Sequence, residues 1–291
     1  MKTLKVVSRE YKLMLHPAKF AGSEQHLLAV AGEFWGELVG AIAPFVVRAD
    51  GALDTISKHR LVSFLDSRGR HLWVGGYVLR LRRTLEGSRP EVTLKFRHPD
   101  RYVAESRQMK SRRIRATIKF EEDIKPPFVS LYGFSTRGRV GRKNVPETLD
   151  AAYAFFPDLP KRLGKINGSP KLRAVNGFTA REMVLTGPIL TIGTKPRAEI
   201  ECALILWYNH QPTSDTPVAV EFSFRYGNTN GRYTGKIARR AYTIFETLQH
   251  NLPEWLDTNT TTKTALVFGC VTPGAARSAR LKPALYTKTT P

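Results

Sequence analysis

The stretch at residues 111–124, SRRIRATIKFEEDI, alternates between two kinds of side chain. One set of alternate positions is polar, with cations first and carboxylates afterwards: Arg113, Arg115, Thr117, Lys119, Glu121 and Asp123. The positions between them are mainly apolar. A period of two is that of a β-strand, whose successive side chains point to opposite faces. The stretch therefore predicts a strand with one apolar face and one densely charged face.

Six further segments also carry charge on one face and large apolar side chains on the other. They are 9–15, 77–83, 91–97, 135–140, 198–204 and 219–226. Any single strand of this kind fits an ordinary sheet with one face in water. Across seven strands, however, Arg and Glu dominate the polar positions and sort into cation-rich and carboxylate-rich strands. This favours a barrel whose polar faces point inward, where charges must be paired or bind an ion.

The rest of the chain fits a mainly β (α+β) class, with a closed or nearly closed barrel and helices packed outside. Helices are predicted from the Ser23 cap to Pro44, within 145–165, and from Thr234 to His250. Residues 262–269 are predicted as the last strand. We expect one domain over residues 1–270, followed by a basic, loosely ordered tail over 271–291.

Charge composition narrows the class of partner. The 291 residues include 46 Lys and Arg but only 25 Asp and Glu, which gives a formal net charge of +21. Such an excess attracts polyanions: nucleic acid, phosphorylated small molecules, polyphosphate or an anionic membrane surface. A generally basic surface, without a specific polyanionic partner, is the plainer alternative.

Cys202 and Cys270 have no metal-ligand spacing. Because neither a signal peptide nor a transmembrane span is apparent, the sequence predicts a cytoplasmic protein without a membrane partner.

One segment carries a family resemblance. Residues 60–83 resemble the second and third strands of the CYTH, or triphosphate tunnel metalloenzyme, superfamily. The matching positions are Phe64, Asp66, Gly76, Leu79, Arg80 and Arg82, with Ser67 where Thr is usual. The segments VTLKFR (92–97), ATIKFEEDI (116–124), STRGRV (135–140) and PVAVEFSFRY (217–226) look like later family strands, in the same order over roughly residues 8–270.

The resemblance implies an eight-stranded antiparallel tunnel that binds a triphosphate group together with magnesium or manganese. Family activities include inorganic, thiamine and RNA 5′-triphosphatases and a class of adenylyl cyclases. It implies phosphate-binding roles for Arg80, Arg82, Lys95, Arg115, Lys119, Arg137, Arg139 and Arg225. It also implies metal ligands at Glu10, Glu121 and Glu221, and catalytic roles for Glu10 and Lys12.

The chain departs from the family at both carboxylate pairs. The first strand has Ser8-x-Glu10-x-Lys12 where the family has Glu-x-Glu-x-Lys, and the late pair is Glu221-x-Ser223. Glu199 and Glu201 are candidate replacements if their face reaches the lumen.

Two functions therefore stay open. One is a metal-dependent triphosphatase that hydrolyses tripolyphosphate or a nucleoside or other organic triphosphate. The alternative is a non-catalytic tunnel protein that binds polyphosphate or another polyanion with a degraded metal site. Nucleic-acid binding is less favoured, because strand-face aromatic residues suited to base stacking are not apparent.

Overall fold

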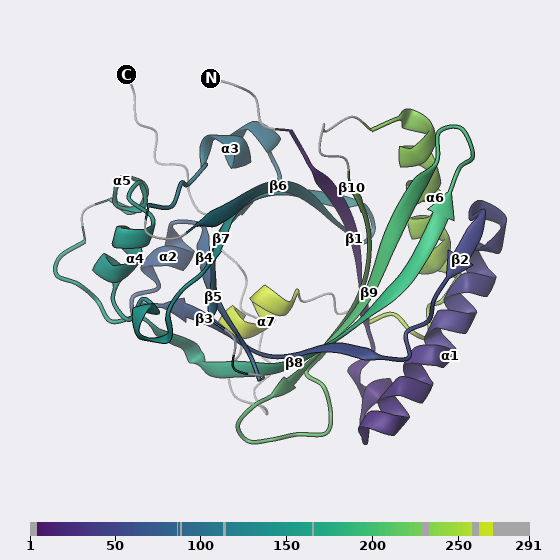
Figure 1. Ribbon diagram of the computed structural model, residues 1–291, viewed down its shortest axis with the longest axis horizontal. Helices are drawn as coiled ribbons and strands as arrows, with labels where there is room; N and C mark the ends of the chain where they lie inside the picture. The colour runs from purple at the N-terminus through teal and green to yellow at the C-terminus, as the bar shows by residue number, and fades with distance from the viewer. Residues whose placement is uncertain are drawn as a thin grey trace.

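The computed structural model describes residues 5–85, 87, 89–112, 115–164, 166–227, 233–257 and 262–269. The predicted tail over 271–291 lies outside these residues, as do Cys270 and two residues of the 111–124 stretch, Arg113 and Ile114. Ten strands form one sheet, and nine of them close into a barrel through pairing between β8 (Arg173–Ile192) and β9 (Ala198–Asn209). Figure 1 shows the ring of strands with most of the helices around it.

The ring contains nine strands. In ring order they are β8 (Arg173–Ile192), β3 (Ile56–Asp66), β4 (Tyr77–Thr84), β5 (Glu91–His98), β7 (Val129–Arg139), β6 (Ala116–Lys125), β1 (Ser8–Leu15), β10 (Ala219–Gly227) and β9 (Ala198–Asn209). The tenth strand, β2 (Arg48–Asp50), pairs with β8 outside the ring. The predicted closed, mainly β barrel is thus confirmed, with nine strands where eight were expected.

One neighbouring pair in the ring is parallel, whereas the prediction was a fully antiparallel tunnel. β1 runs parallel to β6, with Ser8 opposite Glu121 and Tyr11 opposite Ile124. Its other neighbour, β10, is antiparallel. An odd number of strands cannot alternate in direction all the way around a closed ring. The ninth strand therefore accounts for the parallel pair.

Two helices cover one side of the barrel. α1 (Glu24–Ile42) and α6 (Gly235–Asn251) pack on β1, β8, β9 and β10 through a large apolar cluster. Ser23 caps α1 by accepting a hydrogen bond from the His26 amide, and Thr234 accepts from the Ile237 amide to cap α6. The predicted Ser23 cap is therefore confirmed, and the second helix begins at the predicted residue, Thr234.

The α1 segment also corrects one expectation, that no stretch is long enough to cross a membrane. The range Glu24–Phe45 is long and apolar enough for a span by length and composition alone. In the structure, Leu27, Phe34 and Leu38 of this helix are buried against the barrel. The core helix of a folded domain meets the same test.

Short helices cover the opposite side. They are α2 (His71–Val74), α3 (Arg101–Ser106), α4 (Leu149–Phe155) and α5 (Leu159–Leu163), and three 3-10 turns lie at Pro17–Phe20, Ala43–Phe45 and Arg142–Asn144. A second apolar cluster fills the space between these helices and β4 to β7. Asp66 anchors α2 in the β3–β4 connection, because its carboxylate accepts from the amides of Ser67, Leu72 and Trp73 at 2.8, 3.1 and 3.0 Å.

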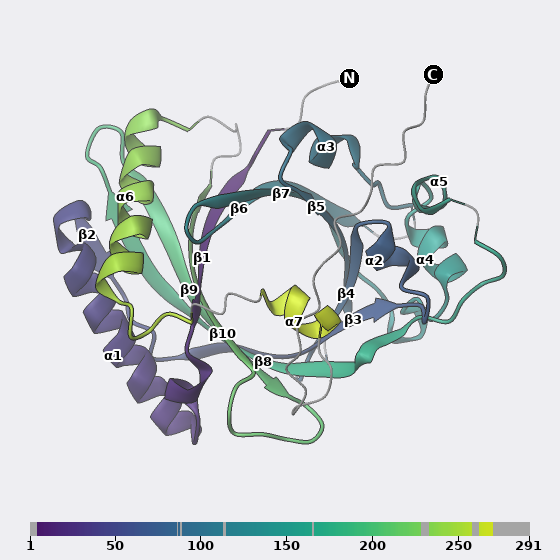
Figure 2. The same cartoon turned by 180° about the vertical axis from the view of Figure 1, so that it is seen from behind.

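The last described element is a helix inside the ring, where a strand was predicted. α7 (Lys263–Gly269) lies within the circle of strands in both views (Figures 1 and 2). Thr262 begins it by accepting from the Ala265 amide at 3.1 Å. Val267 is buried in a third apolar cluster, formed by inward residues of β3, β8, β9 and β10. The segment contains Thr, Val and Phe residues that are common in strands, but the barrel strands are already paired with each other around the ring.

Candidate functional site

The inward side chains enclose two connected cavities. The lumen cavity, of about 680 Å³, is lined by residues of the barrel strands and the start of α7. The outer cavity, of about 1460 Å³, extends from one end of the lumen towards α4. Lys58, Arg60, Arg82, Thr117 and Arg137 line both, so the two spaces are continuous.

Cations outnumber carboxylates among the described residues that line these cavities. The cations are Lys12, Lys58, Arg60, Arg80, Arg82, Arg89, Lys95, Arg97, Arg115, Lys119, Lys125, Arg137, Arg139, Lys143, Arg225 and Lys263. The carboxylates are Glu10, Glu91, Glu121, Asp123, Glu201 and Glu221. The predicted inward orientation of the charged strand faces is therefore observed, and the enclosed space is strongly positive.

Asp123 of β6 is the centre of one charged cluster. Its carboxylate lies 2.9 Å from the Lys12 Nζ, 3.1 Å from the Lys95 Nζ and 2.9 Å from the Arg97 Nε. Burial would raise the pKa of Asp123, but Lys12, Lys95 and Arg97 hold it well below its usual range. Asp123 is therefore ionised, and three cations share its single charge.

Lys12 and Lys95 respond differently to this neighbourhood. Burial would lower the pKa of Lys12, but Asp123 and Glu10, whose carboxylate is 3.0 Å away, raise it. Lys12 therefore carries a charge and is unsuited to accept a proton. Burial, followed by the charge of Arg97, lowers the pKa of Lys95 to about 8. A positive charge on Lys95 is thus only partly compensated, and an anion would stabilise it.

A glycine on β7 makes room for Lys95. Gly133 lies beside β5, opposite Arg97. A Cβ atom at Gly133 would lie 2.7 Å from the Lys95 Cε, closer than such contacts occur. Glycine at this position therefore lets the lysine extend along the lumen wall to Asp123.

Three arginines of β3 and β4 form a second cluster. Arg60 lies 2.6 Å from Glu182 and Arg82 lies 3.6 Å from it, while the Trp207 indole donates to the same carboxylate at 2.8 Å. Burial would raise the pKa of Glu182, but Arg82 and Arg60 lower it to about 2. Burial, and then the charge of Arg82, lowers the pKa of Arg80 to about 9.

These three guanidinium groups have unused donors. The Nε atoms of Arg60, Arg80 and Arg82 are buried and have no hydrogen-bond partner among the described residues. A buried donor without an acceptor is costly, and a guanidinium is shaped to bind phosphate oxygens through two nitrogens. This part of the lumen therefore presents buried donors that suit phosphate oxygens.

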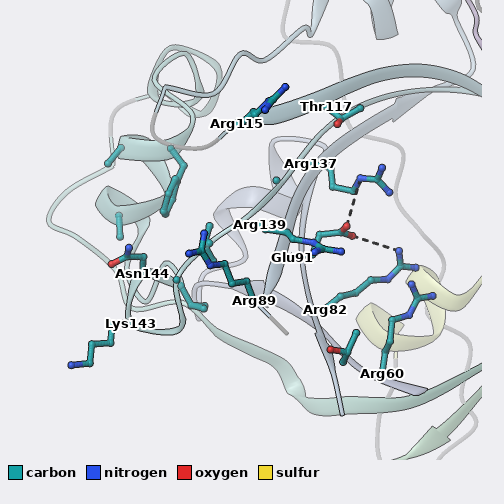
Figure 3. A pocket seen from close by; sticks show the side chains of 18 of the residues that line it. Arg60, Arg82, Arg89, Glu91, Arg115, Thr117, Arg137, Arg139, Lys143 and Asn144 are labelled. Atoms are coloured by element: carbon teal, nitrogen blue, oxygen red, sulfur yellow. Dashed lines mark ion pairs between the residues drawn. The ribbon is translucent and has the colours of Figure 1, made fainter. Parts of the chain in front are cut away.

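The outer cavity continues the positive surface. Glu91 lies 3.9 Å from Arg82 and 3.6 Å from Arg137, as the dashed lines in Figure 3 show. The other basic side chains labelled there are Arg60, Arg89, Arg115, Arg139 and Lys143. An anion that lies in the lumen thus meets further cations on the way out.

The carboxylates expected to hold a metal ion do not form a metal site. Glu10 pairs with Lys12 at 3.0 Å, Glu121 with Lys119 at 3.5 Å, and Glu221 with Lys263 at 3.0 Å. Within the described ranges, no three His, Cys, Asp or Glu residues come together as a metal-binding group. Divalent magnesium and manganese prefer several oxygen ligands around one point. The residues present therefore do not fit such an ion.

The two candidate replacements do not restore that site. Glu201 lines the lumen cavity but lies 2.6 Å from Arg225. Glu199 lines neither cavity, and it pairs at the surface with Arg197 at 3.0 Å.

Most of the expected site residues do come together. Glu10, Lys12, Arg80, Arg82, Lys95, Lys119, Glu121, Arg137, Glu221 and Arg225 line the lumen cavity, and Arg115 and Arg139 line the outer cavity. Four important residues were not among the expected set: Arg60, Arg97, Asp123 and Lys263. Strand alternation identifies Arg97 and Asp123, which share faces with Lys95 and Glu121. It does not single out Arg60, whose strand face also carries Val62 and Phe64. No strand pattern identifies Lys263, which belongs to a helix.

No protein-family model matches the sequence, and no curated protein matches it either. Among solved structures, a candidate adenylyl cyclase from Hippeastrum with a dominant triphosphatase activity has a TM-score of 0.43 and 12% identity, and the match covers 92% of this chain and 98% of that one. A candidate adenylate cyclase from Bacillus halodurans has a TM-score of 0.36 and 13% identity, with 87% and 94% coverage. A third, from Vibrio parahaemolyticus, has a TM-score of 0.35 and 9% identity, with 90% and 99% coverage. These are remote likenesses, at 13% identity or less.

Proposed function

We propose that the barrel binds the phosphate chain of a triphosphate-containing anion, either inorganic tripolyphosphate or the triphosphate end of an organic molecule. The observation that carries this proposal is the set of buried Nε donors of Arg60, Arg80 and Arg82 that have no acceptor among the described residues. Phosphate oxygens are strong acceptors and match the geometry of a guanidinium. A chain of several phosphates would supply acceptors to several arginines at once.

The charge distribution supports a chain over a single phosphate. Cations extend from the cluster around Asp123, past Arg80 and Arg82, to Arg115 and Arg139 in the outer cavity. One phosphate group would satisfy one part of this track and leave the rest of the positive charges repelling one another. Consecutive phosphates would neutralise successive parts of the track.

Hydrolysis of the bound triphosphate is the second candidate. Arg80, Arg82 and Lys95 would stabilise negative charge that develops on the phosphates during cleavage. Burial would raise the pKa of Glu10, but Lys12 lowers it, so Glu10 is an ionised carboxylate able to orient a water molecule. Because the carboxylates do not form a metal site, we assign no step to a metal held by the protein. Magnesium or manganese, if hydrolysis needs it, would arrive bound to the substrate phosphates.

Calorimetric titration of tripolyphosphate into the full-length protein in EDTA tests binding. Arg80→Ala and Arg82→Ala should each weaken binding by about tenfold or more, since each removes a charge-assisted contact of about 1.5–3 kcal/mol. Lys161→Ala, on an exposed part of α5, is the matched control and should leave the affinity unchanged. Full affinity in the Arg80 and Arg82 variants would rule out this site.

Phosphate release separates the two candidates. Turnover of tripolyphosphate or ATP with magnesium or manganese, lost in Glu10→Gln while binding persists, would establish the hydrolase. If the protein binds tripolyphosphate but hydrolyses neither tripolyphosphate nor ATP with either metal, it is a non-catalytic polyphosphate-binding protein. The cytoplasm, where such anions are available, is the compartment that we propose.

A further inference from the structure

α7 introduces a cation into the lumen that does not come from the barrel strands. The Lys263 Nζ lies 3.0 Å from the Glu221 Oε1 of β10. Both side chains are largely buried, with exposed fractions of 14% and 10%. Lys263 and the adjacent Thr262 and Thr264 line the lumen cavity together with the phosphate-binding candidates. The chain therefore places an ammonium group next to a carboxylate that the family resemblance assigns to a metal ion.

Several contacts fix the position of α7. The Phe268 ring stacks on Trp73 with centroids 4.0 Å apart, and Val267 is buried among Phe64, Trp207 and their neighbours. The Asn176 amide donates to the Val267 carbonyl at 2.9 Å. The Lys263 ammonium also lies 5.4 Å from the centre of the Trp207 ring. Lys263 is thus held in the lumen by its own contact with Trp207 and by the packing of Val267 and Phe268 at the other end of the helix.

The same arrangement recurs at the other carboxylates of the site. Each carboxylate that lines either cavity in the described part of the chain has a Lys or Arg nitrogen within 4 Å. A divalent ion would have to displace these cations before it could bind. An ammonium group can donate three hydrogen bonds, so Lys263 can contact both Glu221 and a phosphate oxygen.

We propose that Lys263 takes the place of a divalent cation in this tunnel. It neutralises Glu221, contributes a donor to the bound phosphate chain, and makes anion binding independent of metal. α7 is then part of the binding site. This inference rests on the proposed binding of a phosphate chain.

The test compares tripolyphosphate binding to the full-length protein in EDTA and in excess magnesium, with the free anion concentration corrected for its magnesium complex. The unmodified protein should bind as tightly in EDTA as in magnesium, within about twofold. Lys263→Met, which keeps the apolar stem and removes the charge, should bind about tenfold more weakly in EDTA. Lys263→Arg keeps a cation and should retain most of the affinity, and Lys161→Met serves as the surface control.

Glu221→Gln gives an independent measurement. Removal of a negative charge beside Lys263 should tighten tripolyphosphate binding in EDTA, whereas loss of a metal ligand would weaken binding in magnesium and leave binding in EDTA unchanged. Circular dichroism and thermal melting of each variant establish that the barrel remains folded.

The outcomes separate this inference from the proposed function. Wild-type binding that is strong in magnesium and at least about tenfold weaker in EDTA would overturn the role of Lys263 and keep the binding function. Unchanged affinity of a folded Lys263→Met variant would overturn it as well. Absence of binding in both solutions would overturn both proposals.

Discussion

Lys95 makes phosphate binding sensitive to pH. Its pKa is lowered to about 8, so the unoccupied site carries this charge below that pH and loses it above. A bound phosphate favours the charged form, and binding above pH 8 must therefore take up a proton. We expect tripolyphosphate affinity to fall on the order of tenfold between pH 7 and pH 9.5, because one pKa unit corresponds to about 1.4 kcal/mol.

Titration calorimetry at several pH values measures this effect. Lys95→Arg keeps a charge over the whole range, because an arginine side chain stays protonated in proteins, and should bind with little pH dependence up to pH 9.5. A wild-type affinity that stays constant up to pH 9.5 would contradict the assignment of Lys95 to the phosphate site.

A substitution at Gly133 tests the role of Lys95 by changing the space available to its side chain and leaving its charge unchanged. Gly133→Ala places a methyl group in the path of the Lys95 side chain and should move its ammonium away from Asp123. We expect tripolyphosphate binding to weaken by roughly three- to tenfold, in line with the partial loss of one charged contact. In a Lys95→Ala background the same substitution should have no further effect, as a double-mutant cycle would measure. Gly36→Ala, where an added Cβ meets nothing within 4 Å, is the control.

The connection between β3 and β4 depends on one carboxylate. Asp66 accepts from three backbone amides that would otherwise lack partners at the start of α2. Asp66→Ala should lower the free energy of unfolding by about 1–3 kcal/mol, the usual cost of buried donors left unpaired. Chemical denaturation measures the change, with the exposed Asp54→Ala as control. A loss below a few tenths of a kcal/mol would show that water replaces the carboxylate without cost.

Individual elements differ in how well the sequence predicts them. The segments 77–83 and 91–97 match β4 and β5 to within one residue, because strict alternation marks both faces of these strands. α7 was predicted as a strand, since a seven-residue segment with mixed residues has no reliable period of its own. Its helical state depends on the Thr262 cap and on Trp73, Phe64 and Trp207, which are distant in sequence.

The sequence predicts which charged side chains point into the barrel, but it does not predict all of the ion pairs that they form. Period-two spacing identifies which charged residues point inward. It also places Glu10 beside Lys12 and Glu121 beside Lys119, since each pair lies two residues apart on one strand. The pairs of Asp123 with Lys12 and Lys95 depend on which strands are neighbours and in what register, and the pair of Glu221 with Lys263 depends on α7, so these appear only in three dimensions.

The net positive charge of the whole molecule should make tripolyphosphate affinity depend strongly on the salt concentration. The net charge of +21 and the excess of cations along both cavities attract a polyanion before any specific contact forms. We expect tripolyphosphate affinity to fall by about tenfold or more between 50 and 300 mM salt, because screening lengths shorten to less than about 10 Å over this range. Calorimetry at several salt concentrations measures the slope, and an affinity independent of salt would contradict the electrostatic basis of the site.

The nine-stranded ring also constrains the order in which the protein can fold. β1, near the start of the chain, pairs with β6 and with β10, more than 200 residues further along. During synthesis the ring cannot close until β10 leaves the ribosome, so the charged inner faces stay hydrated until then. Contacts between such distant segments form slowly, since the intervening chain must first be brought together. Closure is thus a late event that assembles the lumen and dehydrates its charges at the same time, and a nascent chain that ends before β10 has no tunnel.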